Sequence, residues 1–322
     1  CEGQFMAGAR RFIADPYDDA KPSAATPRLS PFYHEVPPSF DWGAKRNLRF
    51  PCANFVVLTE VITSLQDKWN GDHIKSDTLA VMNYAQYLVT SSIRHGVSLH
   101  LLHDAQQLGT PSALCDVAPF SELADLCKQM VKSGTLLLAP CNMDWSSHDT
   151  RGYHPQELRM FAGMDYLIKH PEIDCVAHVD SKDVQVLLDM PQQSLFYLLE
   201  EGPASSLAMA RSWDVASSDC ESRKDGFKKR LPGCKLFADA GIVVGYREAM
   251  LRYFRQITDA LAASGHSDLP KDWEMTNQAI DHNFSDIYLF RAEQAAPEEY
   301  ASKHEQFLES VYKLNPPPFS HR

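Results

Sequence analysis

The sequence is poor in long apolar runs and in positive charge. No apolar run reaches about 18 residues, the length that a helix needs to cross a bilayer. The first residues, Cys1 to Gln4, lack the basic patch and apolar stretch of a signal peptide. Against 42 Asp and Glu there are 31 Lys and Arg, a net charge of −11, so a broad basic surface for nucleic acid is excluded. We expect a soluble protein, or the soluble part of a longer one, with no nucleic-acid or membrane contact.

CxxC pairs are absent although the chain has eight cysteines, which argues against a zinc ribbon or a thioredoxin-type redox site. An even number permits disulfides, but Cys127, Cys141 and Cys175 lie in or beside apolar stretches where buried free thiols are equally expected. We expect the secretory lumen (Golgi or ER), with the cytoplasm as the alternative. The sequence also lacks a GxGxxG after a strand, which argues against an enzyme that uses NAD.

Apolar residues are plentiful, at 44% of the chain, so a large core can form. Residues 1–50 hold six prolines among small and polar residues, without the periodicity of a strand or a helix. They are predicted to be a proline-rich extension or stem. Residues 51–322 are predicted to form one domain.

Apolar runs typical of strands alternate with helical patterns from residue 54 onward. Strands are predicted over residues 55–59, 97–102, 135–139 and 175–179, and helices over 74–94, 120–131 and 156–169. The last helix is expected to bury one apolar face, made of Leu158, Phe161, Met164, Leu167 and Ile168. The alternation predicts an α/β fold with a mostly parallel, doubly wound, twisted sheet.

Two aspartates, Asp180 and Asp183, follow the strand 175–179 directly. In open α/β sheets ligands bind at the carboxyl ends of strands, and two carboxylates there can hold Mn²⁺ or Mg²⁺ against a diphosphate. The alternative is that Asp180 caps a turn while Asp183 pairs with Lys182 or with solvent. His178, inside the strand, is expected to be a core histidine satisfied by a hydrogen bond.

Four segments carry a family resemblance. CVAHVDSKDVQVLLD (175–189) resembles the metal-binding stretch of GT-A type glycosyltransferases. LFADAGIVVGYREAMLRYF (236–254) is similar to a turn and helix of those families, most of all in the glycosyltransferase domain of collagen lysyl hydroxylases. WEMTNQ (273–278) lies where those enzymes carry an acidic segment ending in Gln, and residues 316–321 are similar to their closing histidine motif.

This resemblance covers residues 54–321 and implies a single GT-A (Rossmann-like) domain. It implies a metal-dependent hexosyltransferase that moves a sugar from a nucleotide diphosphate donor, expected to be a UDP-sugar, to a hydroxyl of a protein or glycan, with retention. Because a fold with partial motifs does not guarantee turnover, the alternative is a non-catalytic GT-A-fold module that binds a sugar nucleotide or a glycan.

Three sets of site residues are predicted from the DxxD strand end and this resemblance. The expected metal ligands are Asp180, Asp183 and His321, with His282 as the alternative to His321. The expected cofactor-binding residues are Thr59, Glu60, Arg159, Asp180, Lys182 and Gly241. The expected catalytic residues are Asp239, Asn277 and Gln278.

Chemistry motivates several of these assignments. Imidazole favours Mn²⁺ over Mg²⁺, which prefers oxygen ligands. Asp239 can accept hydrogen bonds from sugar hydroxyls, and Gly241 lets the backbone approach the donor; a plain tight turn is the alternative for this segment. Thr59 and Glu60 end the first strand where a uridine would lie. Arg159 would offset phosphate charge, or else face solvent.

Overall fold

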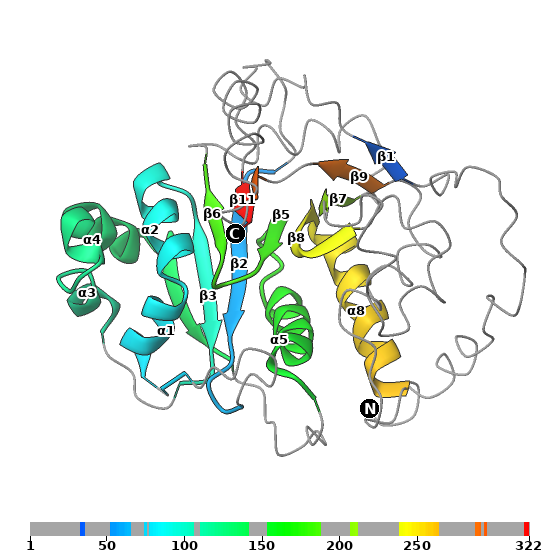
Figure 1. Ribbon diagram of the computed structural model, residues 1–322, viewed down its shortest axis with the longest axis horizontal. Coiled ribbons are helices and arrows are strands. Elements are labelled where there is room, and N and C mark those ends of the chain that lie inside the picture. The colour runs from blue at the N-terminus through cyan, green and yellow to red at the C-terminus, as the bar shows by residue number, and fades with distance from the viewer. Residues whose placement is uncertain are drawn as a thin grey trace, which may run out of the picture.

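A computed structural model of the chain describes two β-sheets and the helices that cover them (Figure 1). The described residues are 33–35, 52–65, 74–75, 77–105, 110–141, 153–187, 207–211, 238–263, 287–290, 293–294 and 319–321.

The main sheet has eight strands within these residues. In chain order they are β1 (Tyr33–Glu35), β2 (Phe55–Val61), β3 (Leu99–His103), β4 (Leu136–Pro140), β5 (Cys175–Val179), β7 (Leu207–Arg211), β8 (Ala238–Tyr246) and β9 (Ile287–Phe290). Their spatial order is β1-β9-β7-β8-β5-β2-β3-β4, and only the two pairings made by β8 are antiparallel. The predicted α/β fold with a mostly parallel sheet is confirmed. The carboxyl ends of the parallel strands and the amino end of β8 therefore share one edge.

A smaller sheet of three strands brings the end of the chain beside β5. It contains β6 (Val184–Val186), β10 (Glu293–Gln294) and β11 (Phe319–His321). β11 is antiparallel to β6 and parallel to β10. Phe319 is fully buried in the core, so this sheet is anchored to the main one.

Helices cover both faces of the main sheet, as Figure 1 shows. They are α1 (Thr78–Tyr84), α2 (Gln86–His95), α3 (Pro111–Leu114), the 3₁₀ helix η2 (Phe120–Leu123), α4 (Ala124–Ser133), α5 (Pro155–Lys169) and α8 (Arg247–Ala263). α2 and α4 end at Gly96 and Gly134, whose φ angles of 61° and 78° are left-handed and suit glycine. Among the described helices, none has the length and hydropathy needed to cross a membrane.

Two apolar cores lie on opposite faces of the sheet. β2 contributes residues to both cores. All seven of its residues are buried, and successive residues, such as Val57 and Leu58, face opposite sides of the sheet. One core includes residues of α1, α2 and α4, and the other includes residues of α5 and α8. The second contains four residues of α8: Met250, Phe254, Ile257 and Leu261.

Two helical predictions differ from the structure. The helix predicted over 74–94 is two helices, because the chain leaves helical geometry at Ala85, where φ is −92° and ψ is 20°. On α5, Leu158 and Leu167 are buried as expected, but Ile168 is 53% exposed. Ile168 lies one residue beyond Leu167, and a helical step of about 100° carries it off the buried face.

The segment Asp239 to Gly241, predicted as a turn, lies inside β8. The strand is irregular there, because Met209 pairs with Val243 while the next residue, Ala210, pairs with Asp239. The extra residues of β8 include Gly241, so the turn-like sequence forms a bulge in a strand.

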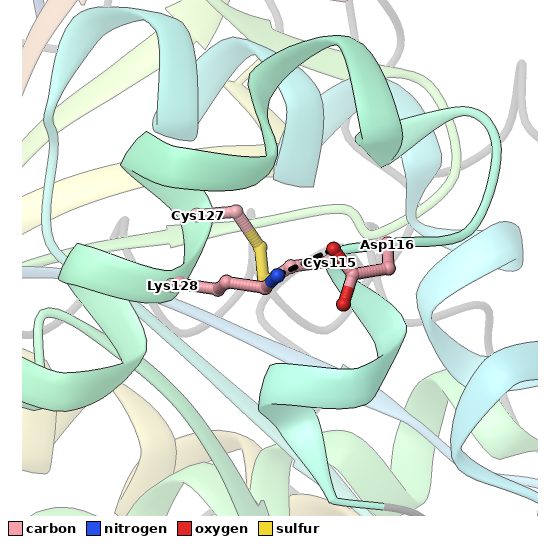
Figure 2. The surroundings of a disulfide bond; sticks show 4 residues. All are labelled: Cys115, Asp116, Cys127 and Lys128. Carbon is pink, nitrogen blue, oxygen red and sulfur yellow. Dashed lines mark hydrogen bonds and ion pairs between the residues drawn. A yellow bond between two sulfur atoms is a disulfide. The ribbon is translucent and has the colours of Figure 1, made fainter.

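Two disulfides join distant parts of the described chain. Cys52, before β2, is bonded to Cys175 of β5, with a Cα–Cα distance of 5.6 Å. Cys115 is bonded to Cys127 and thereby ties α3 to α4; Figure 2 shows the adjacent ion pair between Asp116 and Lys128. Cys127 and Cys175, for which a disulfide and a buried free thiol were equally expected, are therefore both disulfide-bonded. Cys141 is the free cysteine among the described residues, and burial raises the pKa of its thiol well above the usual value.

The predicted extension, residues 1–50, contributes one described element. β1 pairs in parallel with β9, with Tyr33 opposite Ile287. At least this part of the extension therefore belongs to the main sheet, while the domain boundary at residue 50 stays a prediction.

Candidate functional site

A cleft of about 630 Å³, counting the space open to solvent at its mouth, lies where β2 and β5 end. Its polar lining comes from β2, from α5 and from the link between β5 and β6: Glu60, Gln156, Arg159, Asp180, Ser181, Lys182 and Asp183. Its apolar lining comes from the end of β2 and from the region of α1: Val61, Ile62, Leu65, Ile74 and Tyr84. The combination suits a ligand that has a charged part and a flat apolar part.

The predicted DxxD segment occupies the link between β5 and β6. β5 is a fully buried strand, and the link places both Asp180 and Asp183 in the cleft lining. The amide of Asp180 donates to the carbonyl oxygen of Gly241 at 2.8 Å, which fixes the start of the link against β8. The structure thus places the two aspartates and Gly241 close together.

Arg159 of α5 forms an ion pair with Asp180, from Nη1 to Oδ1. The side chain of Arg159 is 9% exposed and that of Asp180 is 27% exposed. α5 is held in place at its start, where His154 accepts from the amide of Gln156 and Glu157 accepts from the amide of His154. Arg159 therefore faces the cleft, and the solvent-facing alternative is excluded.

The side chains of Thr59 and Glu60, near the end of β2 beside the cleft, form hydrogen bonds that link β2 to β5. The Thr59 hydroxyl donates to the carbonyl oxygen of Val179 at 2.8 Å, and Thr59 is fully buried. On the opposite face of β2, Nε2 of His178 donates to Oε2 of Glu60 at 2.8 Å, which confirms the core role of His178. Glu60 reaches the cleft lining, but Thr59 does not.

Lys182 contributes the second cation of the cleft. Its ammonium lies 5.7 Å from the centre of the Tyr84 ring, within the range of a cation–π contact. Tyr84, the last residue of α1, supplies an aromatic ring to the cleft lining.

Of the three predicted metal ligands, the structure places Asp180 and Asp183 in the cleft lining and describes only the backbone of His321. His321 is the register partner of Val184, the residue that follows Asp183. Of its side chain nothing is described, and within the described residues no three His, Cys, Asp or Glu side chains form a group that could hold a metal. The two carboxylates suit a hard divalent ion such as Mn²⁺ or Mg²⁺. The neighbouring cations, Arg159 and Lys182, can bind phosphate groups.

The remaining predicted residues are placed only in part. Asp239 lies on β8 two residues before Gly241, at the sheet edge where the cleft opens, and its backbone alone is described. Asn277, Gln278 and His282 lie outside the described residues.

A further carboxylate, which the sequence patterns missed, shapes the rim of the cleft. Asp104, just after β3, accepts from the amide and hydroxyl of Thr63 at 2.5 and 2.7 Å and from the amide of Ser64 at 3.0 Å. These bonds fix the chain that leaves β2 toward Leu65. The available signal is an aspartate two residues after the strand predicted over 97–102.

A cluster of titratable rings lies away from the cleft, beside α5. The Tyr166 hydroxyl is hydrogen-bonded to Nδ1 of His100 at 2.8 Å, and Nδ1 of His170 lies 2.7 Å from Glu172. Burial, with the nearby charge of His170, lowers the pKa of His100 to about 4. Burial, with the charge of Glu172, raises the pKa of Tyr166 to about 12. Both groups are neutral near pH 7.

Comparisons with known proteins gave only structural similarities. No protein family model matches the chain, and no curated protein matches it. The chain is similar to the crystal structure of galactosyltransferase LgtC in complex with donor and acceptor sugar analogs, at 13% identity and a TM-score of 0.44, over 83% of this chain and 86% of that one. It is also similar to an active-site mutant of LgtC, at 12% identity and a TM-score of 0.44, over the same shares of 83% and 86%. Neither is a collagen lysyl hydroxylase, so that part of the resemblance stays a prediction.

Proposed function

We propose that the chain is a metal-dependent glycosyltransferase that takes a nucleotide diphosphate sugar, with UDP as the nucleotide, and transfers the sugar to a hydroxyl group. The observation that carries this proposal is the composition of the cleft. Asp180 and Asp183 share it with Arg159 and Lys182, and an apolar wall that includes Tyr84 completes it. A diphosphate suits the charged groups, and a pyrimidine ring suits the apolar wall.

The residues of the cleft have separate roles in this proposal. Asp180 and Asp183, with His321, would hold Mn²⁺ or Mg²⁺, which supplies Lewis-acid stabilisation of the leaving diphosphate. Arg159 and Lys182 offset further negative charge on the phosphates. Asp239 and Gly241, at the same edge, contact the donor sugar.

Glu60 and Thr59 have a revised role in this proposal. Glu60 is bonded to His178 and Thr59 to Val179, and both contacts reach β5 just before Asp180. We therefore assign both residues to positioning the strand end, with Glu60 also part of the cleft lining.

Retention of anomeric configuration, a hexose as the transferred sugar and a protein or glycan acceptor rest on the family resemblance. A secretory location is supported by the two disulfides, because such bonds persist in oxidising compartments.

The test is calorimetric titration of UDP with and without Mn²⁺, followed by an assay of UDP release from UDP-sugars. Wild-type protein should bind UDP more tightly with Mn²⁺ and should lose this gain in EDTA. Asp183→Asn should lose the metal-dependent gain in UDP binding. Asp116→Asn is the control and should keep it, because Asp116 is an exposed acid between α3 and α4. Binding without UDP release from any donor would identify a non-catalytic binding module. Unchanged UDP binding in EDTA would reject the metal site.

A further inference from the structure

The Arg159–Asp180 ion pair joins two groups that the proposed function gives to different partners. Asp180 is a proposed metal ligand, and Arg159 a proposed diphosphate contact. The described structure instead pairs them with each other, Nη1 to Oδ1, in a largely buried position. A cation of the protein therefore already neutralises the carboxylate that the metal needs.

The other charges of the cleft decide what happens to this pair. The lining holds the carboxylates of Asp180 and Asp183 and the cations of Arg159 and Lys182, whereas the carboxylate of Glu60 is fully buried against His178. A divalent ion bound at Asp180 would stand beside the guanidinium of Arg159, and two cations at such short range repel each other strongly in a partly buried site. A diphosphate removes this repulsion, because guanidinium binds phosphate oxygens through its planar set of N–H donors.

We propose that Arg159 is a counter-ion exchanged between Asp180 and the donor diphosphate. It holds Asp180 while the metal is absent, and it passes to the diphosphate when the metal takes Asp180. This inference rests on the proposed function. It makes metal and nucleotide depend on each other, so each should bind weakly alone and tightly together, by the same factor in either order.

Binding measurements test the exchange without turnover. Mn²⁺ alone, UDP alone and UDP at saturating Mn²⁺ are titrated into wild type, Arg159→Met, Arg159→Lys and the control Lys128→Met. Lys128 of α4 pairs with Asp116, which follows α3 (Figure 2). Lys128 is not among the residues that line the cleft, so its replacement removes one positive charge elsewhere on the protein.

Arg159→Met should bind Mn²⁺ alone on the order of 10-fold more tightly than wild type, because the competing cation is gone. Its UDP affinity at saturating Mn²⁺ should fall, and the factor by which Mn²⁺ strengthens UDP binding should shrink. Lys128→Met should match wild type. Arg159→Lys, which keeps the charge but loses the planar fork, should fall between wild type and Arg159→Met and serves if Arg159→Met does not fold.

The outcomes separate the two proposals. Unchanged or weaker binding of Mn²⁺ alone by both Arg159 variants, with wild type binding Mn²⁺ and UDP normally, overturns the exchange and leaves the proposed function standing. A wild-type protein that binds neither Mn²⁺ nor UDP overturns both.

Discussion

His321 of β11 lies opposite Val184 of β6, one residue beyond Asp183. The last strand of the described chain thus passes directly beside the DxxD link, although 137 residues (321 − 184) separate the two positions in the sequence. This pairing gives a structural reason for expecting the third metal ligand at the end of the chain.

The first prediction concerns His321. His321→Ala should raise the Mn²⁺ concentration for half-maximal UDP binding by on the order of 10-fold, since one ligand is lost. A point variant is preferable to truncation after Pro318, because Phe319 is fully buried and its loss would cost about 3–5 kcal/mol of stability. Unaltered Mn²⁺ dependence would reject His321 and favour His282.

Local patterns predicted the main features of the fold and part of the site. The apolar strand 175–179 followed by Asp180 and Asp183 could be predicted because a buried run and a polar strand end are both local signals. The glycines that end α2 and α4 are local signals too. The bulge at Gly241 was read as a turn, because small residues and glycine are typical of both.

Other features depend on residues that are distant in the sequence. Eight cysteines allow about 105 full pairings, so the bond between Cys52 and Cys175 could not be selected. Arg159 and Asp180 are 21 residues apart, and their contact requires α5 to pack beside the end of β5. The bond between Glu60 and His178 spans 118 residues and depends on the pairing of β2 with β5.

The second prediction concerns Asp239 on β8. Asp239→Asn keeps the shape and removes the charge, so turnover should fall while UDP affinity stays within about 2-fold, if the carboxylate contacts the donor sugar only. Steady-state kinetics and UDP titration measure the two effects. Asp259→Asn, at an exposed position on α8, is the matched control. An equal loss of UDP binding would move Asp239 to the phosphate or metal contacts.

The third prediction concerns Gly163 on α5. A Cβ there would lie 2.9 Å from Oε1 of Glu60 and 3.0 Å from the ring of Phe254. Gly163→Ala should therefore lower the free energy of unfolding by about 1–3 kcal/mol, although the same change in an open helix adds about 1 kcal/mol. Urea unfolding measures it, with Ile168→Ala on the exposed face as control. A gain in stability would show that Glu60 and Phe254 yield without cost.

The fourth prediction concerns His100 and pH. Its pKa is about 4 in the folded protein and 6.5 in the unfolded chain, so the unfolded state binds more protons between these values. Stability should fall as pH drops from 6.5 to 4, by up to about 3 kcal/mol from this group. Close to it, Nδ1 of His170 lies 2.7 Å from Oε1 of Glu172. Urea unfolding at pH 7 and pH 4.5 should show a smaller loss in His100→Gln than in wild type; an equal loss would assign the effect elsewhere.

The fifth prediction compares the two disulfides. The bond between Cys52 and Cys175 spans 123 residues, whereas that between Cys115 and Cys127 spans 12. Closing the longer loop removes more entropy from the unfolded chain, so its loss should cost about 5 kcal/mol against about 3 kcal/mol for the shorter one. Paired Cys→Ala variants of each bond, unfolded in guanidinium, measure the difference. Equal costs would mean that loop entropy does not set the ranking and that local packing around Cys175 and Cys127 does.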